Sequence, residues 1–219
     1  MASAVDICNL ALGHLGDDAT VSSISPPEGS SQAEHCQRFY PIARDLCLEA
    51  HEWGFATTRA TLAALSNTPP PGFTYVYQLP SDCRNIVDLV DPNAVSDFHC
   101  VDYGQHWHGF DQEPVPYELE TLADGTQVIY TNLAGAQLRY IRGVTDTTKF
   151  SAQFVDALAW LLAAYLAGPV IKGDTGMQVG QAMMRAFIGS ISQAKTSDAN
   201  NRRRSRAQSE RNPSWIANR

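Results

Sequence analysis

The densest group of potential metal ligands in this 219-residue sequence lies between residues 97 and 111. Its candidate side chains are His99, Cys100, Asp102, His106, His108 and Asp111. On a strand, His106 and His108 would point to one face, where a thiolate or carboxylate could complete a zinc site. Their spacing matches no closed zinc motif, however, and Gly104 and Gly109 are typical of turns. The segment is therefore interpreted either as a metal site or as a polar surface loop.

Other enzymatic signatures are missing from the sequence. It contains no G-x-S-x-G nucleophile motif, and neither GHLG at 13–16 nor GDTG at 173–176 has the Lys-Ser/Thr ending of a phosphate loop. The 5 cysteines are an odd number without a C-x-x-C pair, and the first residues lack the basic start of a secretory leader. We therefore expect no enzyme activity, no cofactor and a reducing compartment.

Helical patterns occupy both ends of the chain. The first helix is predicted over 4–15, with Ser3 and Asp6 forming a capping box and Gly16 ending it. A second helix is predicted from 31 to 53, kinked or broken near Pro41. A third begins after the N-cap Ser151 and is expected to end at 168–169. The last follows residue 174, with an apolar side made of Met177, Met183, Ala186, Phe187, Ile191 and Ala194.

Short strands are predicted between these helical ends. They span residues 75–79, 85–90, 117–122, 126–130 and 137–142, and Asp124-Gly125 is typical of a hairpin turn between two of them. The fold class is thus α+β, a helical bundle formed by the N- and C-terminal helices with an inserted small antiparallel β-domain. The expected divisions are N-terminal bundle helices at 1–66, the β-rich insertion at 67–148, C-terminal bundle helices at 149–200 and an extended arm at 201–219.

The apolar stretch at 157–171 holds 15 residues without a charge and is interrupted by Gly168-Pro169. That length is too short to cross a bilayer. We interpret it as a core helix and expect no membrane partner.

Charge is divided unevenly along the chain. The formal net charge of −7 separates into −12 for residues 1–200 and +5 for residues 201–219. An acidic body excludes a nucleic-acid-binding domain that is basic throughout. The basic end is either a solubilising tail or an interaction arm, and Trp215-Ile216 favours an arm because a solvating tail has no use for an exposed Trp. The candidate arm residues are Arg202, Arg203, Arg204, Arg206, Arg211, Trp215 and Ile216.

Three stretches resemble the head-to-tail adaptors of tailed bacteriophages, also called tail tubular protein A-like or head completion proteins. They are ICNLALGHLG at 7–16, the stretch from Ala33 through FYPIARD at 39–45 to HEWGFA at 51–56, and YQLPSDCR at 77–84. With the strands before the Phe150-Ser151 helix, the resemblance extends to about residue 200.

The resemblance implies a structural protein of the virion. In that family, 12 copies form a ring beneath the portal, the tail tube or nozzle docks below, and double-stranded DNA passes through during genome ejection without sequence-specific binding. A C-terminal segment commonly embraces the portal, which would assign portal binding to the arm. The protein would then act at the head-tail interface after assembly in the host cytoplasm.

Two alternatives stay open beside the adaptor. The first is a small regulatory or DNA-binding protein that uses its arginine-rich tail on nucleic acid, with affinity that falls steeply with salt. The second is a metal-dependent enzyme centred on His106 and His108.

Overall fold

The computed structural model describes residues 2–92 and 115–201, which form two compact units. One unit comprises both ends of the chain, up to Phe55 and from Thr145 onward, and it is helical. The other, Ala56–Val144, contains the strands. The mixed α+β class predicted from the sequence is confirmed.

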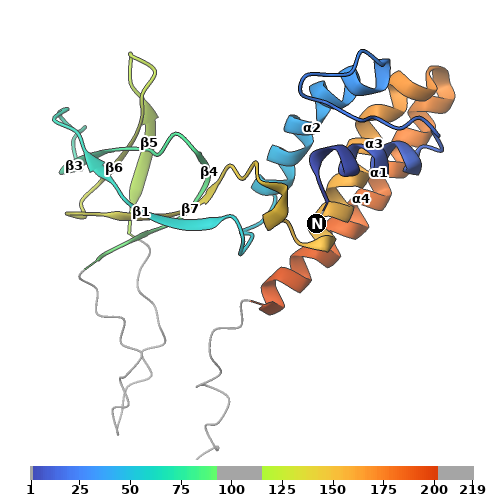
Figure 1. Cartoon of the computed structure of the whole chain (residues 1–219). Helices are drawn as coiled ribbons and strands as arrows, with labels where there is room; N and C mark the ends of the chain where they lie inside the picture. Colours follow the sequence, from blue (N-terminus) through green and yellow to red (C-terminus); the bar gives the residue numbers. More distant parts are fainter. Residues whose placement is uncertain (1, 93–114, 202–219) are drawn as a thin grey trace, which may run out of the picture. The chain divides into compact units, whose positions relative to one another are not determined.

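The helical unit consists of α1 (Ala4–His14), α2 (Ser31–Glu49), α3 (Ala152–Ile171) and α4 (Gly173–Asn201), with the short 3-10 helix η1 (Thr147–Lys149) before α3. α3 is its centre, because α1, α2 and α4 all pack on it (Figure 1). Nine apolar side chains of α3 are buried: Phe154, Ala157, Leu158, Ala159, Leu161, Leu162, Ala163, Leu166 and Ala167.

Local capping signals predict the helix starts correctly. Ser3 Oγ accepts from the Asp6 amide at 3.1 Å while the Asp6 carboxylate accepts from the Ser3 amide at 2.8 Å, which completes the capping box. Ser151 likewise caps α3 through the Phe154 amide at 3.2 Å. Gly16, just after α1, has a φ of 74°, a conformation that glycine adopts without steric cost.

At both internal prolines the helix continues where the sequence predicted a break or an end. α2 runs unbroken through Pro41, and α3 continues past Pro169 to Ile171. Pro41 and Gln37, whose carbonyl loses its partner, are both exposed, so water can satisfy that carbonyl. The buried face of α2 meanwhile keeps its packing. The turn to α4 comes later than expected, at Lys172 and Gly173, which both have positive φ.

α3 and α4 approach closely at two glycines of α4. A Cβ added at Gly176 would lie 2.9 Å from the carbonyl oxygen of Ala167, and one at Gly180 would lie 3.3 Å from that of Ala164. Real Cβ atoms essentially never come within 3.0 Å of another heavy atom. The absence of side chains at these two positions therefore sets the spacing of the two helices.

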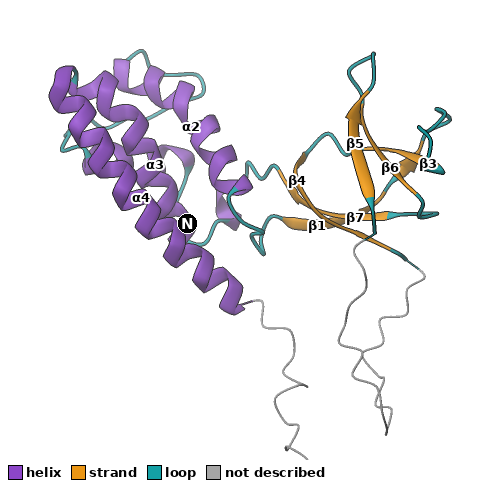
Figure 2. Cartoon of the chain, turned by 180° about the vertical axis from the view of Figure 1, so that it is seen from behind, coloured by secondary structure: helices purple, strands orange, loops and turns teal. Residues whose placement is uncertain are grey.

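The described residues of the β unit form two antiparallel sheets (Figure 2). The first has strand order β1-β7-β4, from Thr57–Thr61, Gln137–Arg142 and Cys83–Val90. The second has order β2-β3-β6-β5, from Ala63–Ala64, Tyr75–Gln78, Gln127–Thr131 and Tyr117–Thr121. The predicted hairpin is confirmed, since β5 pairs with β6 around Gly125, whose φ is 85°.

The expected boundary at residue 67 differs from the one observed. β1 and β2 belong to the β unit, which begins at Ala56 and ends at Val144 rather than at 148. β1 is held by pairing with β7, a strand about 80 residues away in the sequence. Because its partner strand is so distant in the sequence, the residues around β1 contain no pattern that predicts the strand.

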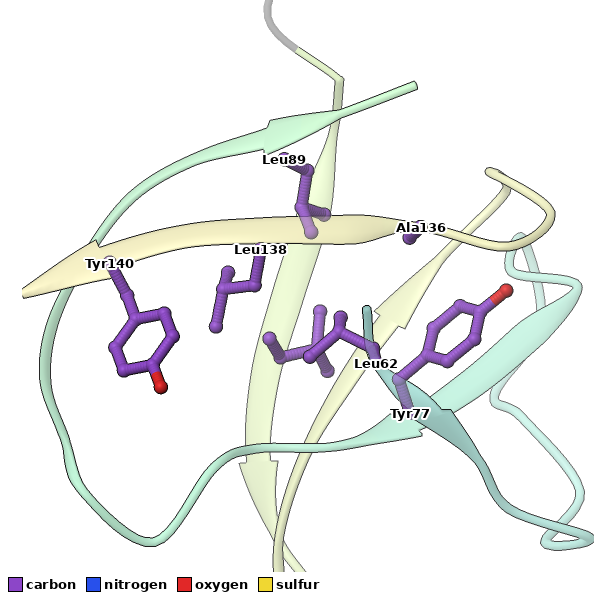
Figure 3. Close-up of a cluster of buried hydrophobic side chains, with 7 residues drawn as sticks. Leu62, Tyr77, Leu89, Ala136, Leu138 and Tyr140 are labelled. Atoms are coloured by element: carbon purple, nitrogen blue, oxygen red, sulfur yellow. The ribbon is translucent and has the colours of Figure 1, made fainter. Parts of the chain in front are cut away.

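Side chains from both sheets share the core of the β unit (Figure 3). The buried cluster consists of Leu62, Tyr77, Leu89, Ile129, Ala136, Leu138 and Tyr140. The Tyr77 hydroxyl also donates to the Leu133 carbonyl at 2.9 Å and accepts from the Gly135 amide at 2.8 Å, which fixes the turn between β6 and β7. This cluster gives the β unit a hydrophobic core of its own.

By length and composition alone, α3 is apolar enough to cross a membrane, but half of its most apolar window is buried inside the protein. A core helix of a soluble protein passes the same test.

Candidate functional site

Both sites that the sequence singles out lie outside the described residues. The possible metal ligands fall within 93–114, and the arm residues Arg202, Arg203, Arg204, Arg206, Arg211, Trp215 and Ile216 follow the end of α4 at Asn201. Within 2–92 and 115–201, no group of three or more His, Cys, Asp or Glu side chains is placed to hold a metal ion.

The end of α4, from which the arm departs, is fixed to the region after α2. The Asp198 carboxylate accepts from the Gly54 amide at 3.0 and 3.2 Å, and its Oδ2 lies 3.3 Å from His51 Nε2. Trp53 lies between His51 and Gly54 in the sequence. Its side chain is fully buried, and its Nε1 donates to the Cys47 carbonyl at 2.7 Å. These bonds give the arm a defined starting point on the helical unit.

A shallow hollow of about 470 Å³ lies beside this helix end. It is lined by Gln153, Ser192, Gln193, Thr196, Ser197, Asn200 and Asn201. These side chains are hydroxyls and amides without a formal charge, so they supply hydrogen bonds but neither an acid-base pair nor an anion clamp. The hollow suits a polar contact better than a reaction.

A serine, an aspartate and a histidine come from three helices of the unit, but they are not linked as a catalytic triad. Ser190 Oγ donates to Asp156 Oδ2 at 2.6 Å rather than to an imidazole. His14 stacks on Trp160 with ring centroids 3.7 Å apart, and burial lowers the pKa of its imidazole. These contacts hold α4 and α1 against α3, through the Ser190–Asp156 hydrogen bond and the His14–Trp160 stacking.

Of the four described cysteines, Cys8, Cys47 and Cys83 have a raised thiol pKa, whereas the hydrogen bond with Cys8 lowers the pKa of Cys36. Burial raises the pKa of Cys47 to about 12 and that of Cys83 to about 11. The hydrogen bond with Cys36, together with burial, also raises the pKa of Cys8. At neutral pH a thiol of this kind has almost no reactive thiolate.

Exposed apolar side chains form the most distinctive surface of the helical unit. On α4, Met177 is 66% and Ile188 60% exposed, and the half-buried Met184 lies on the same helical face between them. On α2, Ile42 and Leu46 are also exposed and are neighbours at i and i+4. Such patches commonly mark protein interfaces.

The sequence pattern did not locate these patches. It placed Met177 on the buried side of the last helix, whereas the structure buries only Gly176, Ile191 and Ala194 of α4. Leu46 of α2 is likewise exposed, although it lies three residues after the buried Ala43. One feature of the sequence could have indicated the exposed patch on α4. Ile188 follows Phe187 directly, so the apolar stripe of the helix is wider than one neighbouring helix can cover.

The sequence matches no protein-family model, and no curated protein is significantly similar to it.

Proposed function

We propose that the protein is a head-to-tail adaptor of a tailed bacteriophage, a structural protein that forms a ring below the portal and docks the tail. The observation that carries the proposal is where the three adaptor-like stretches lie in the fold. Residues 7–16 cover most of α1 and its glycine stop, 33–56 cover most of α2 and the buried Trp53, and 77–84 join β3 to β4. The resemblance thus includes segments of both units, among them two helices that pack on α3.

Three physical features support this role. The exposed apolar faces of α2 and α4 offer contacts for neighbouring copies, which a ring requires. The charge of −12 over residues 1–200 repels phosphates, so DNA can pass without being bound. The arm predicted at 201–219 begins at a helix end anchored by Asp198 and supplies arginines and an aromatic anchor for the portal.

Truncation after Asn201 tests the portal-binding role. Because the described fold ends there, the truncated protein should stay folded by circular dichroism but fail to attach to portal-bearing capsids in negative-stain images. Full-length protein with Trp215→Ser and Ile216→Ser should show the same defect with the chain length preserved. Undiminished attachment or unchanged yield of infectious particles would refute the assignment.

Variants of the α4 patch separate ring formation from portal binding. Met177→Ser with Ile188→Ser removes exposed apolar area and should reduce ring assembly in sedimentation experiments, with little loss of stability. Asn200→Ser, in the polar hollow, serves as a control. Tight binding of the full-length protein to free duplex DNA, lost steeply with salt, would instead support the DNA-binding alternative.

A further inference from the structure

Two thiols from different helices meet in the core of the helical unit. Cys8 lies on α1 and Cys36 on α2, and neither residue has any exposed surface. The Cys8 thiol is hydrogen-bonded to the sulfur of Cys36. Both cysteines are free thiols, so their sulfur atoms are neighbours without a covalent bond between them.

Packing on both helices holds the two thiols in place. Asn9, the residue after Cys8, ties α1 to the loop that follows: its Nδ2 donates to the Val21 carbonyl at 2.9 Å, and its Oδ1 accepts from the Val21 amide at 2.7 Å. On α2, Cys36 lies one turn after Ala33, which is also fully buried. Both helices pack on α3. The contact between the thiols thus belongs to the packed interior of the unit.

The hydrogen bond gives the two thiols different chemical roles. Because Cys8 donates to Cys36, the pKa of the Cys36 thiol is lowered, whereas the same bond and burial raise that of Cys8. Cys36 therefore forms the thiolate more readily, and the thiolate is the form that attacks an oxidant. Cys8 keeps its proton beside it. An attacking thiol with a second thiol next to it is the arrangement in which oxidation ends as a disulfide.

Burial limits the oxidants that can reach this pair. Since neither cysteine has exposed surface, a bulky oxidant such as glutathione disulfide cannot contact the sulfur atoms while the helical unit is folded. Hydrogen peroxide is small and uncharged, so local opening of the packing is enough to admit it. A peroxide is therefore the class of oxidant that suits the site.

We propose that Cys8 and Cys36 form a disulfide between α1 and α2 when the protein meets hydrogen peroxide. The Cys36 thiolate attacks one peroxide oxygen, the O–O bond breaks, and Cys36 becomes a sulfenic acid. The hydroxide that leaves takes up the proton that Cys36 had lost. The Cys8 sulfur then attacks the Cys36 sulfur, the S–O bond breaks, and the hydroxyl leaves as water with the Cys8 proton. The two thiols lose two electrons in total, and one peroxide is reduced to two waters.

The disulfide would link two helices that otherwise meet mainly through α3. It closes a loop of roughly 28 residues, which restricts the unfolded chain and should raise the melting temperature of the helical unit by about 5–10 °C. In a reducing compartment the pair stays as two thiols. The inference rests on the packing of the helical unit alone, and it holds or fails independently of the adaptor role.

Peptide mapping of the peroxide-treated full chain tests this proposal. The protease Glu-C cuts after Glu28 and Glu34, which lie between the two cysteines, so only a disulfide keeps their peptides together without reductant. The linked peptides should be lighter than the two free ones by two hydrogen atoms and should separate on reduction. Melting followed by circular dichroism should show the higher transition after peroxide and the original one after dithiothreitol.

Cys36→Ala and Cys47→Ala form a matched pair of variants. Both replace a fully buried cysteine of α2, so they lose similar packing, but only the first removes the bonding partner of Cys8. Peroxide should raise the melting temperature of Cys47→Ala as in wild type and should leave that of Cys36→Ala unchanged. The peptide map of wild type decides the question even where a variant folds poorly.

Three results would overturn the proposal. Peroxide could convert Cys36 to a sulfinic acid while Cys8 can still be alkylated. The first disulfide to form could involve Cys83 or Cys100 instead. The linked peptides could also appear without a rise in melting temperature, which would mean that the bond forms only by distorting the packing of α1 and α2.

Discussion

The close approach of α3 and α4 gives a sharp quantitative prediction. Gly176→Ala places a methyl group 2.9 Å from the backbone carbonyl oxygen of Ala167 and 3.5 Å from the Cα of Gly168. Because both neighbours are backbone atoms of a helix, they cannot rotate away, and the helices must separate by several tenths of an ångström. Overpacking of this kind costs about 1–3 kcal/mol. The better helix propensity of alanine offsets up to about 1 kcal/mol of that cost.

Two other glycines of the same helix provide the comparison. Gly189 has no atom within 4 Å of an added Cβ, so Gly189→Ala should gain up to about 1 kcal/mol from helix propensity alone. Gly180→Ala, with its nearest contact at 3.3 Å, should lie between the two. The predicted order of stability is therefore Gly189→Ala, then Gly180→Ala, then Gly176→Ala.

Urea unfolding followed by circular dichroism at 222 nm measures these differences, since this signal reports the helical unit. Gly189→Ala should exceed Gly176→Ala by about 1–3 kcal/mol, with similar m values. Equal stability of the two variants would refute the reasoning, because it would mean that the α3–α4 spacing does not depend on the missing side chain.

Two further predictions concern α1 and α2. The hydrogen bond from the Ser3 backbone amide holds the pKa of the Asp6 carboxyl below its ordinary value. The ionised carboxylate therefore stabilises the fold at any pH above the ordinary pKa of an aspartate, and this stabilisation is lost as the pH falls through the lowered pKa of Asp6. The difference in melting temperature between wild type and Asp6→Asn should accordingly be present at pH 7 and shrink below about pH 4. Trp53→Phe removes the buried bond to the Cys47 carbonyl and part of a packed side chain, and it should cost about 2–4 kcal/mol in urea unfolding. A loss below about 0.5 kcal/mol would show that this carbonyl finds another partner.

Features that depend on neighbouring residues in sequence could be predicted. The capping box of Ser3 and Asp6, the N-cap at Ser151 and the turn at Asp124-Gly125 each need only a few adjacent residues, and all three are present. The five strands from 75 to 142 were located to within about two residues for a similar reason, since turn residues separate them.

Features decided by distant packing could not be predicted in the same way. β1 depends on β7 for its partner, and α2 keeps its helix through Pro41 because its buried face packs on α3. The exposure of Met177 depends on which helices are present to cover α4, a property that helical periodicity alone does not contain. As for the predicted sites, the arm and the possible metal ligands lie beyond the described residues and stay predictions.

The insertion of the β unit between α2 and α3 has a consequence for biosynthesis. α1 and α2 leave the ribosome first, but α3, the helix against which both bury their apolar faces, follows only after residues 50–151. At typical elongation rates that delay is roughly 5–20 s. During this time the β unit can fold around its own core. The apolar side chains of α1 and α2 that are buried in the folded protein, such as Ile7, Leu12 and Leu48, stay exposed to solvent until α3 is made. The helical unit is thus expected to form only after the β unit has been synthesised, and α1 and α2 to need chaperone protection until then.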